Sequence, residues 1–166
     1  ALALLMAGRR WGDQSLIDAG TAMAKAIWEH EVTLVDGRPY LTAGSWAQES
    51  NPVAINPSYL APYAYRVFAE VDKEHDWLAL VDSSYELLFA ATEAGLGATQ
   101  SAGLPSDWVG LDRETGELVP LELSGEATTA YSYDAPRAFW RAALDARWSG
   151  DGRAADAVAL ERARAE

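Results

Sequence analysis

Apolar residues recur at helical spacing in several stretches of the chain, and these stretches predict most of its structure. In one of them the apolar side chains repeat from Leu16 to Trp28. We expect helices over residues 1–11, 13–30, 56–71 and 76–94, another from residue 133 or 134 to 148, and a sixth over 153–166. Asn56 is the expected N-cap of the third helix, and Gly95 is the expected end of the fourth.

The segments between these helices are alternately short and long. The longest covers residues 31–56, and a loop of that length without secondary structure is usually functional. Loops rich in small and polar residues flank a short predicted hairpin over residues 109–119. The pattern predicts an all-α fold of antiparallel helical hairpins, either an α-solenoid or part of an α/α toroid. Because no sequence repeat is visible, the toroid is favoured.

Composition restricts the function. The chain has 166 residues, 49% of them hydrophobic and 23% charged, which is typical of a globular protein. Its net charge of -12 argues against binding nucleic acid or an anionic membrane. The absence of Cys excludes disulfides and thiolate-bound metals, and only two His are present, so we expect no cofactor and no metal site. No apolar run approaches the roughly 20 residues of a membrane span.

Both ends of the sequence read as the inside of a helix. Residues 1–11 have no capping residue before them, and residues 153–166 have no Gly or Pro terminator. We therefore expect a piece of a longer chain, with a trimmed small domain as the alternative.

The segment around Asp134 is the first candidate for chemistry. Asp134 lies where a polar loop meets a helix, so its carboxylate can accept main-chain N–H groups and stay ionised, as a general base must. Tyr133 beside it can stack on a sugar ring, and Arg137 can clamp Asp134 or a substrate hydroxyl. The alternative is structural: an Asp N-cap with an Arg on the helix surface.

Two further segments carry aromatic residues in polar surroundings. Trp46 lies in the long loop, and Tyr59 follows Asn56 and Pro57. Sugar rings present apolar C–H faces to aromatic rings, and a Tyr hydroxyl can orient a water molecule. Trp108 ends a third segment, Gly103-Leu104-Pro105-Ser106-Asp107-Trp108. The structural alternatives are a loop-anchoring Trp46, a helix cap at Asn56 and a packing Trp108. The aromatic residues within predicted helices are expected mainly in the core: Trp11, Trp28, Trp77, Phe89, Trp140 and Trp148.

Taken in order, these segments resemble glycoside hydrolase family 8, the bacterial endoglucanases and their relatives. The resemblance rests on residues 2–8 with Trp11-Gly12, Leu41 with Gly44-Ser45-Trp46, Asn56-Pro57-Ser58-Tyr59-Leu60-Ala61-Pro62, Gly103 to Trp108, and Ser132-Tyr133-Asp134-Ala135 with Arg137 and Trp140-Arg141.

The resemblance implies an (α/α)6 barrel and inverting endo-hydrolysis of a β-1,4-linked glucan. It makes Asp134 the general base, Tyr59 the residue that holds the attacking water and Arg137 its support. Trp46 and Tyr133 become sugar platforms, and Trp108 is a further candidate for substrate binding. The resemblance also implies an exported bacterial protein that is a monomer when full length.

The sequence departs from the family in what it lacks. The general acid of the family is a Glu upstream of this chain. Residues 2–8 with Trp11-Gly12 resemble the tail of the family's signature helix, and the Asp-rich start of that helix is missing too. We therefore expect residues 1–166 to be the C-terminal portion of the catalytic domain, about half of the barrel, and to have no appreciable activity in isolation.

Other functions stay open at this point. A non-catalytic carbohydrate-binding helical module would use the same aromatic platforms without Asp134. An α-helical scaffold for protein partners would use neither the aromatic platforms nor Asp134. Within the same family, xylan or chitosan is an alternative substrate, and the acidic chain would suit cationic chitosan.

Overall fold

Helices form most of the structure. The computed structural model describes residues 1–97, 101, 103–123 and 126–165. Parts of the loop predicted over residues 95–108, of the polar loop after residue 119 and of the C-terminal end therefore lie outside the described residues. The helices are α1 (Leu2–Trp11), α2 (Gln14–Glu31), α3 (Pro62–Val71), α4 (Trp77–Glu93), α5 (Pro136–Ser149) and α6 (Gly152–Ala165), with the 3-10 turns η1 (Ser45–Ala47) and η2 (Pro57–Tyr59).

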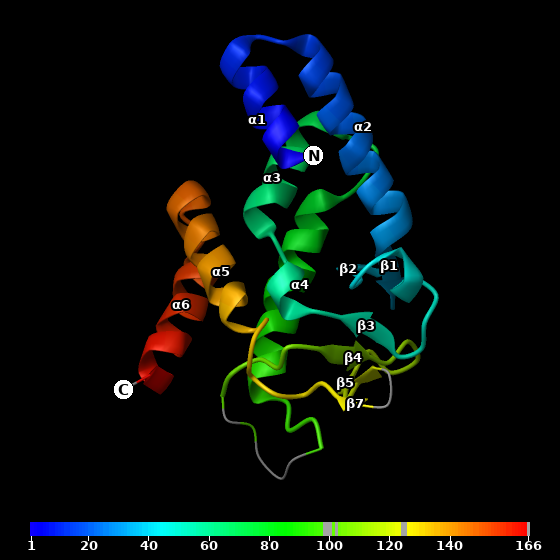
Figure 1. Cartoon of the computed structure of the whole chain (residues 1–166), viewed down its shortest axis with the longest axis vertical. Coiled ribbons are helices and arrows are strands. Elements are labelled where there is room, and N and C mark those ends of the chain that lie inside the picture. The colour runs from blue at the N-terminus through cyan, green and yellow to red at the C-terminus, as the bar shows by residue number, and fades with distance from the viewer. Residues whose placement is uncertain (98–100, 102, 124–125, 166) are drawn as a thin grey trace.

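Successive helices run in opposite directions (Figure 1). α1 and α2 form one antiparallel pair, α3 and α4 a second, and α5 and α6 a third, and α3 also packs against α5. α3 and α5 both begin near the strands and run away from them, so their N-terminal ends lie on the same side of the molecule (Figure 1). The antiparallel helical hairpins that the sequence predicts are therefore present.

Local capping explains where several helices begin. Asp13 caps α2 by accepting the N–H groups of Ser15 and Leu16, and Asp76 caps α4 by accepting the N–H of Ala79. The predicted third helix is wrong in its first turn, because Asn56 caps only the short turn η2. The chain leaves that turn, and α3 starts afresh at Pro62, since proline lacks the N–H that a helix interior needs.

The long segment before α3 contains strands, which corrects its prediction as an irregular loop. β1 and β2 form a hairpin directly after α2, and β3 pairs with β4, the first strand of the predicted hairpin. Register pairs Val53 with Leu111 and Ile55 with Val109, all of them buried. The strands are β1 (Val32–Val35), β2 (Arg38–Leu41), β3 (Val53–Ile55), β4 (Val109–Leu111), β5 (Leu118–Val119), β6 (Glu122–Leu123) and β7 (Glu126–Ala127).

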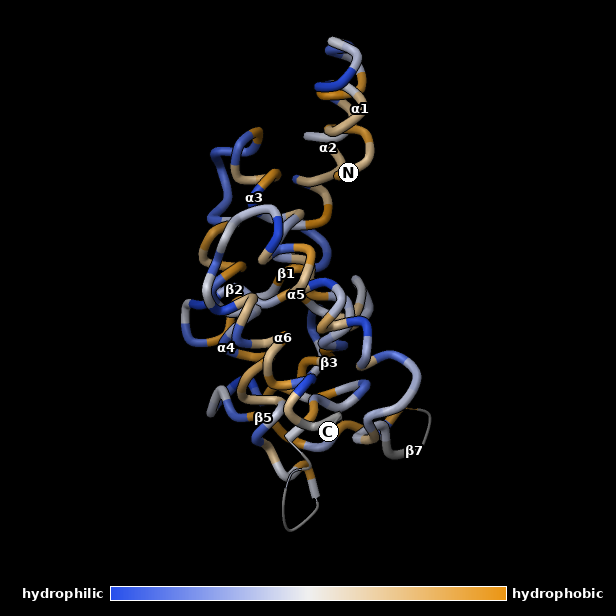
Figure 2. The backbone as a smooth tube through the Cα atoms, turned by 90° about the vertical axis from the view of Figure 1, so that its left-hand side faces the viewer, coloured by the Kyte–Doolittle hydropathy of each residue, from blue (hydrophilic) through white to orange (hydrophobic). Residues whose placement is uncertain are grey.

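The main core lies between the helices. Leu5, Trp77 and Leu80 are fully buried, and the apolar stretches of the trace run through this interior, whereas the turns are hydrophilic (Figure 2). The expectation that the helical aromatics are core residues is wrong for three of them. The exposed fraction of the side chain is large at Trp11 (74%), Trp140 (60%) and Trp148 (49%). All three lie on helix surfaces and are largely open to solvent, although Trp148 also meets Tyr63 of α3 edge to face, with ring centres 5.4 Å apart.

A buried ion pair ties α3 to α5. Arg66 on α3 donates two hydrogen bonds to the carboxylate of Asp145 on α5, at 2.9 and 3.1 Å. Tyr85 on α4 donates its hydroxyl to the same carboxylate at 2.6 Å, and Asp145 is fully buried. Arg66 also contacts Asp151, just before α6, at 2.6 Å. One polar cluster therefore fixes four helices relative to one another.

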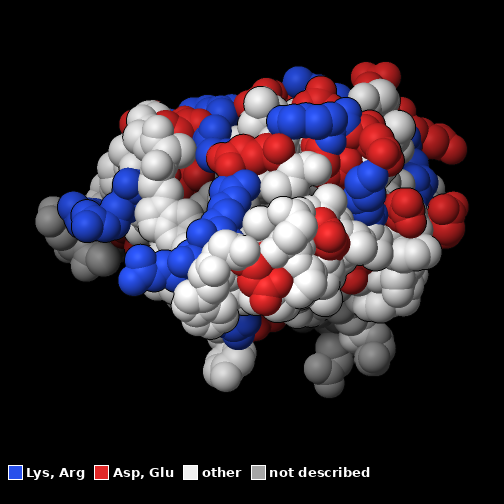
Figure 3. All heavy atoms as spheres, turned by 90° about the horizontal axis from the view of Figure 1, so that it is seen from above, with Lys and Arg blue, Asp and Glu red and all other residues white. Residues whose placement is uncertain are grey.

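The face that carries the turn between α1 and α2 has acidic and basic side chains side by side (Figure 3). No helix within the described ranges is long and apolar enough to cross a membrane.

Candidate active site

Asp134 lies in the turn before α5, and two side chains hold its carboxylate. Asn56 donates its side-chain N–H to Asp134 Oδ2 at 2.9 Å, and Arg137 donates to Asp134 Oδ1 at 2.5 Å. The side chain of Asp134 is 19% exposed, whereas Asn56 is almost completely buried. The amide oxygen of Asn56 accepts the N–H of Ser58 at 2.9 Å, so its NH2 group faces Asp134. Each of the two carboxylate oxygens is thus held by a different side chain.

Asp134 is not a helix cap. The N-cap of α5 is Ala135, and no side chain accepts its first N–H groups from that position. This contradicts the structural alternative for Asp134. It also corrects the expectation that its carboxylate accepts main-chain N–H groups, because its hydrogen bonds come from side chains instead.

The main-chain N–H groups of this turn converge on a different carboxylate, that of Asp107. Burial alone would raise the pKa of Asp107, but the hydrogen bonds from the Ser132 hydroxyl and the main chain outweigh it, so the pKa is lower than usual. The donors are the N–H groups of Ser132 (3.1 Å), Tyr133 (3.2 Å), Asp134 (3.1 Å) and Ala135 (2.8 Å), together with the Ser132 hydroxyl.

Tyr133 presents its ring to solvent beside the Asp134 carboxylate. Its side chain is 85% exposed, and the Arg137 guanidinium lies 5.2 Å from the ring centre. Arg137 therefore contacts both Asp134 and Tyr133, and it holds the ring with one face against a cation.

Tyr59 and Trp108 meet edge to face, with ring centres 6.0 Å apart. Tyr59 is 36% exposed and belongs to the same short turn that Asn56 caps. Trp108 is half-buried and packs against a small apolar cluster that includes Ala47 and Ala54. Trp108 therefore packs as its structural alternative expects, while the side chain of Tyr59 stays partly exposed.

Trp46 lies on η1 and is 59% exposed, so it does not anchor its loop by burial. The loop is held instead by Arg113, which donates to the carbonyls of Ser50 and Gln48 and to the Thr33 hydroxyl. Among the described residues, no hydrogen bond or ring contact joins Trp46 to Asp134 or its neighbours.

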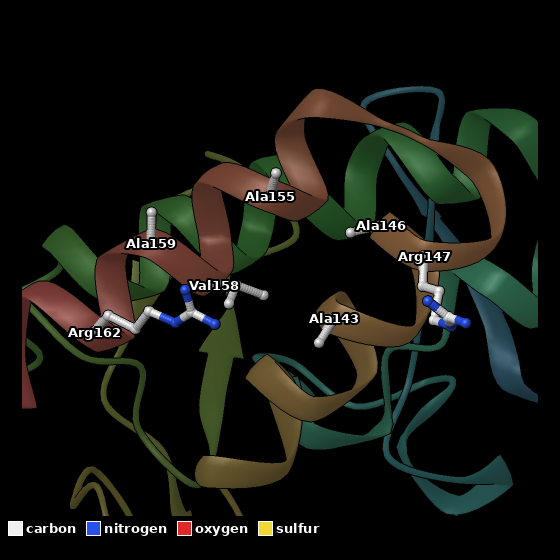
Figure 4. Close-up of a pocket in the computed structure, with 7 residues that line it drawn as sticks. All are labelled: Ala143, Ala146, Arg147, Ala155, Val158, Ala159 and Arg162. Carbon is white, nitrogen blue, oxygen red and sulfur yellow. The ribbon is translucent and has the colours of Figure 1, made fainter.

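The described part of the chain contains no group of three His, Cys, Asp or Glu side chains placed to hold a metal ion. A groove of about 610 Å³ lies elsewhere, between α5 and α6 (Figure 4). It contains no acid and none of the candidate residues, which makes it unsuitable for acid–base chemistry. Its lining is Ala143, Ala146, Arg147, Ala155, Val158, Ala159 and Arg162.

Two residues of the site are not predicted as site residues by the sequence. Asn56 reads only as a cap in the sequence, and Asp107 reads as part of a turn before Trp108. Their contacts to the Asp134 segment span 78 residues for Asn56 and up to 28 for Asp107, beyond any local pattern. The only available signal was their position within the segments Asn56–Tyr59 and Gly103–Trp108.

Curated relatives with similar sequences are endoglucanases and glucanases. Endoglucanase A of Acetivibrio thermocellus is 32% identical over 158 residues, which cover 93% of this chain and 30% of that protein. An endoglucanase of Escherichia coli K12 is 32% identical over 141 residues, 84% of this chain and 34% of that protein. The chain thus spans about a third of the length of these relatives.

Solved structures share the arrangement of helices. A GH8 endo-β-1,4-glucanase from an Achatina fulica gut metagenomic library is 29% identical with a TM-score of 0.75, and the match covers 89% of this chain and 44% of that one. The fold of a β-1,3-1,4-glucanase from Paenibacillus sp. X4 is also similar, with a TM-score of 0.75 over 96% of this chain and 42% of the other. The described helices therefore form part of an (α/α)6 barrel. The family model of the glycosyl hydrolases family 8 matches residues 1–165, so the chain belongs to that family.

Proposed function

We propose that this chain contributes the general base to an inverting, endo-acting hydrolase of β-1,4-linked glucans, including mixed-linkage glucans. The observation that carries the proposal is the Asp134 carboxylate, which is held on one oxygen by Asn56 and on the other by Arg137. Both neighbours donate hydrogen bonds, and together they fix the orientation of the carboxylate. An oriented carboxylate at the edge of an exposed surface is what a general base requires.

In an inverting reaction, the base removes a proton from a water molecule as that water attacks the anomeric carbon. A carboxylic acid on the other side of the bond protonates the leaving oxygen. Asp134 takes the first role in our proposal, and Tyr59, which leaves the same turn as Asn56, helps to hold the water. Arg137 keeps the carboxylate oriented.

Asp107, the other carboxyl group of the site, is unsuited to act as the acid. Its hydrogen bonds favour the ionised form and lower its pKa, so it holds no proton to donate near neutral pH. We therefore propose that the acid comes from a Glu outside this chain and that residues 1–166 are a portion of the catalytic domain, inactive in isolation.

The exposed aromatic rings supply the binding surface. Tyr133 is adjacent to the base and Trp46 lies on a separate turn, and each presents a ring to solvent. Pyranose rings pack on such faces. Trp108 supports this surface through its contact with Tyr59.

The names of the relatives support the substrate class. The proteins similar to this chain are endoglucanases, a β-glucanase and a β-1,3-1,4-glucanase. Because these polysaccharides are too large to enter a cell intact, we propose an exported enzyme that acts as a monomer when full length.

The test uses the natural full-length protein that contains this sequence. Asp134→Asn keeps the shape of the side chain but removes the base. We expect kcat on a soluble β-glucan to fall at least about 100-fold with little change in KM, since general base catalysis contributes about 10²–10⁴. Asp112→Asn is the matched control, because Asp112 caps an exposed turn of the hairpin through the N–H groups of Glu114 and Thr115. The first product of the wild-type enzyme should be the α-anomer.

Full activity in Asp134→Asn would refute the role of Asp134. Binding of oligosaccharide without any hydrolysis by the wild-type protein would instead favour a carbohydrate-binding module. Preferential cleavage of xylan or chitosan would leave the mechanism in place and change the substrate.

A further inference from the structure

The turn that carries Asp134 has few anchors of its own. Tyr133 is 85% exposed and Tyr131 is 37% exposed, so neither ring is fixed by the core. No side chain of this segment caps α5. The buried residue of the turn is Ala135, whose methyl group alone cannot set the orientation of a neighbouring carboxylate.

Asp107 supplies the missing anchor from another part of the chain. Its carboxylate accepts the N–H groups of four consecutive residues, from Ser132 to Ala135, and also the Ser132 hydroxyl. Such a set of converging N–H groups forms an anion-binding concavity, and here a side chain occupies it. The main chain of Asp107 is fixed as well, because its N–H donates to the Ala130 carbonyl at 2.7 Å.

The contacts around Asp107 form a closed ring. Asp107 holds the turn that contains Asp134, and Asp134 accepts from Asn56. Asn56 caps the turn that contains Tyr59, and Tyr59 packs on Trp108, the residue after Asp107. A change at Asp107 therefore acts on both segments that meet at the base.

We propose that Asp107 is a positioning residue, whose carboxylate holds the main chain of residues 132–135 so that Asp134 meets Asn56 and Arg137. The inference rests on the proposed function, because Asp134 must react for its position to matter. The lowered pKa of Asp107 agrees with a carboxylate that is charged while it holds the turn.

The experiment replaces Asp107 by Asn in the natural full-length protein that contains this chain. The amide keeps the shape but turns one acceptor oxygen into a donor that faces N–H groups. We measure kcat and KM on a soluble β-glucan, amide hydrogen exchange of the peptide that covers residues 131–137, and the midpoint of thermal unfolding. Asp112→Asn is again the control, because it also removes a carboxylate that caps a turn.

We expect kcat to fall about 10- to 100-fold, since a misplacement of about 1 Å costs up to about 100-fold. KM should change less than kcat, and exchange at residues 132–135 should accelerate while exchange in the helices stays unchanged. Ser132→Ala, which removes one hydrogen bond and leaves the carboxylate, should show the same changes at smaller size. Asp112→Asn should leave kcat and this exchange unchanged.

The outcomes separate the two proposals. Unchanged kcat and unchanged exchange in Asp107→Asn, with an active wild-type enzyme, overturn the positioning role alone. A loss of kcat that only follows a fall in the unfolding midpoint also overturns it, since that is the mark of a merely structural residue. If Asp107→Asn does not fold, Ser132→Ala decides by the same two measurements. A wild-type protein without hydrolysis refutes the proposed function and the positioning role with it, whatever the exchange shows.

Discussion

The Arg66–Asp145 pair offers a direct test of what holds the helices together. Arg66→Met keeps the length and much of the apolar stem of the side chain but removes the guanidinium. Among the described residues, the Tyr85 hydroxyl is then the one remaining hydrogen-bond donor to the Asp145 carboxylate, which is fully buried. Burial raises the pKa of Tyr85, as does its hydrogen bond to Asp145, so this tyrosine stays a neutral donor and cannot replace the lost cation.

The size of the effect follows mainly from the two hydrogen bonds lost at the buried Asp145, at 2.9 and 3.1 Å. Asp151 also loses its bond from Arg66, but it keeps its hydrogen bonds from Arg153. Each hydrogen bond to a charged group contributes about 1.5–3 kcal/mol, and breaking a buried ion pair costs about 3–5 kcal/mol. The Arg66 side chain is 28% exposed, so we take the lower end. We expect a loss of about 3 kcal/mol in the free energy of unfolding, or about 6–12 °C in the unfolding midpoint at this chain length.

Urea unfolding followed by tryptophan fluorescence measures the change. Arg38→Met is the matched control, because Arg38 makes two hydrogen bonds to Glu86 on the surface and exposed pairs contribute little. The double variant Arg66→Met with Asp145→Leu should be more stable than Arg66→Met alone, since it leaves no uncompensated buried charge. Equal effects of Arg66→Met and Arg38→Met, or strictly additive effects of the two changes in the double variant, would refute this reasoning.

Two further predictions concern binding and pH. Trp46→Ala should raise KM on a soluble glucan about 2- to 10-fold with little change in kcat, as expected for the loss of one aromatic platform of about 0.5–1.5 kcal/mol; an unchanged KM would remove Trp46 from the binding surface. The pKa of Asp151 is lowered by its hydrogen bonds to Arg153 and Arg66 against the opposing effect of burial, so its contribution to stability is full above about pH 4 and is lost as the pH falls below that value. The urea concentration at the unfolding midpoint should therefore decrease as the pH is lowered from 5 to 2.5, and it should decrease less in Asp151→Asn. An equal decrease in both proteins would contradict the role of Asp151 in acid stability.

The sequence was sufficient for the helices because their signals are local. Apolar spacing located all six, and the carboxylates of Asp13 and Asp76 mark where α2 and α4 begin. Errors occurred where proline sets the boundary. α3 begins at Pro62 and α5 at Pro136, since proline fits the first helical turn and not the interior.

The strands between α2 and α3 were not predictable in the same way. β3 has three residues, too few for an alternating pattern, and it is stabilised by pairing with β4, more than 50 residues later. The exposure of the tryptophans on α5 was not predictable for a related reason. Trp140 and Trp148 are large aromatic residues of a kind common in cores, and only the three-dimensional arrangement shows that both stay largely exposed.

The candidate site also combines contacts that are local in the sequence with contacts that are tertiary. Asp134 and Arg137 are three residues apart, and this short separation lets the Arg137 guanidinium reach back from the first turn of α5 to a carboxylate that lies just before the helix. Asn56 and Asp107 reach Asp134 and its turn through tertiary contacts, so the sequence predicts the contact from Arg137 but neither of these two.

The buried ion pair and the site are parts of one construction. Asn56 and Tyr59 lie just before α3, and Asp134 lies just before α5, so the distance between these two helices decides whether the amide of Asn56 reaches the carboxylate. Arg66 joins the same two helices further along. A shift of α3 against α5 would lengthen the 2.9 Å hydrogen bond from Asn56 to Asp134, while the bond from Arg137, which moves with α5, would survive. Loss of Arg66 should therefore reduce turnover as well as stability, with Asp134 still paired to Arg137 but free on its other oxygen.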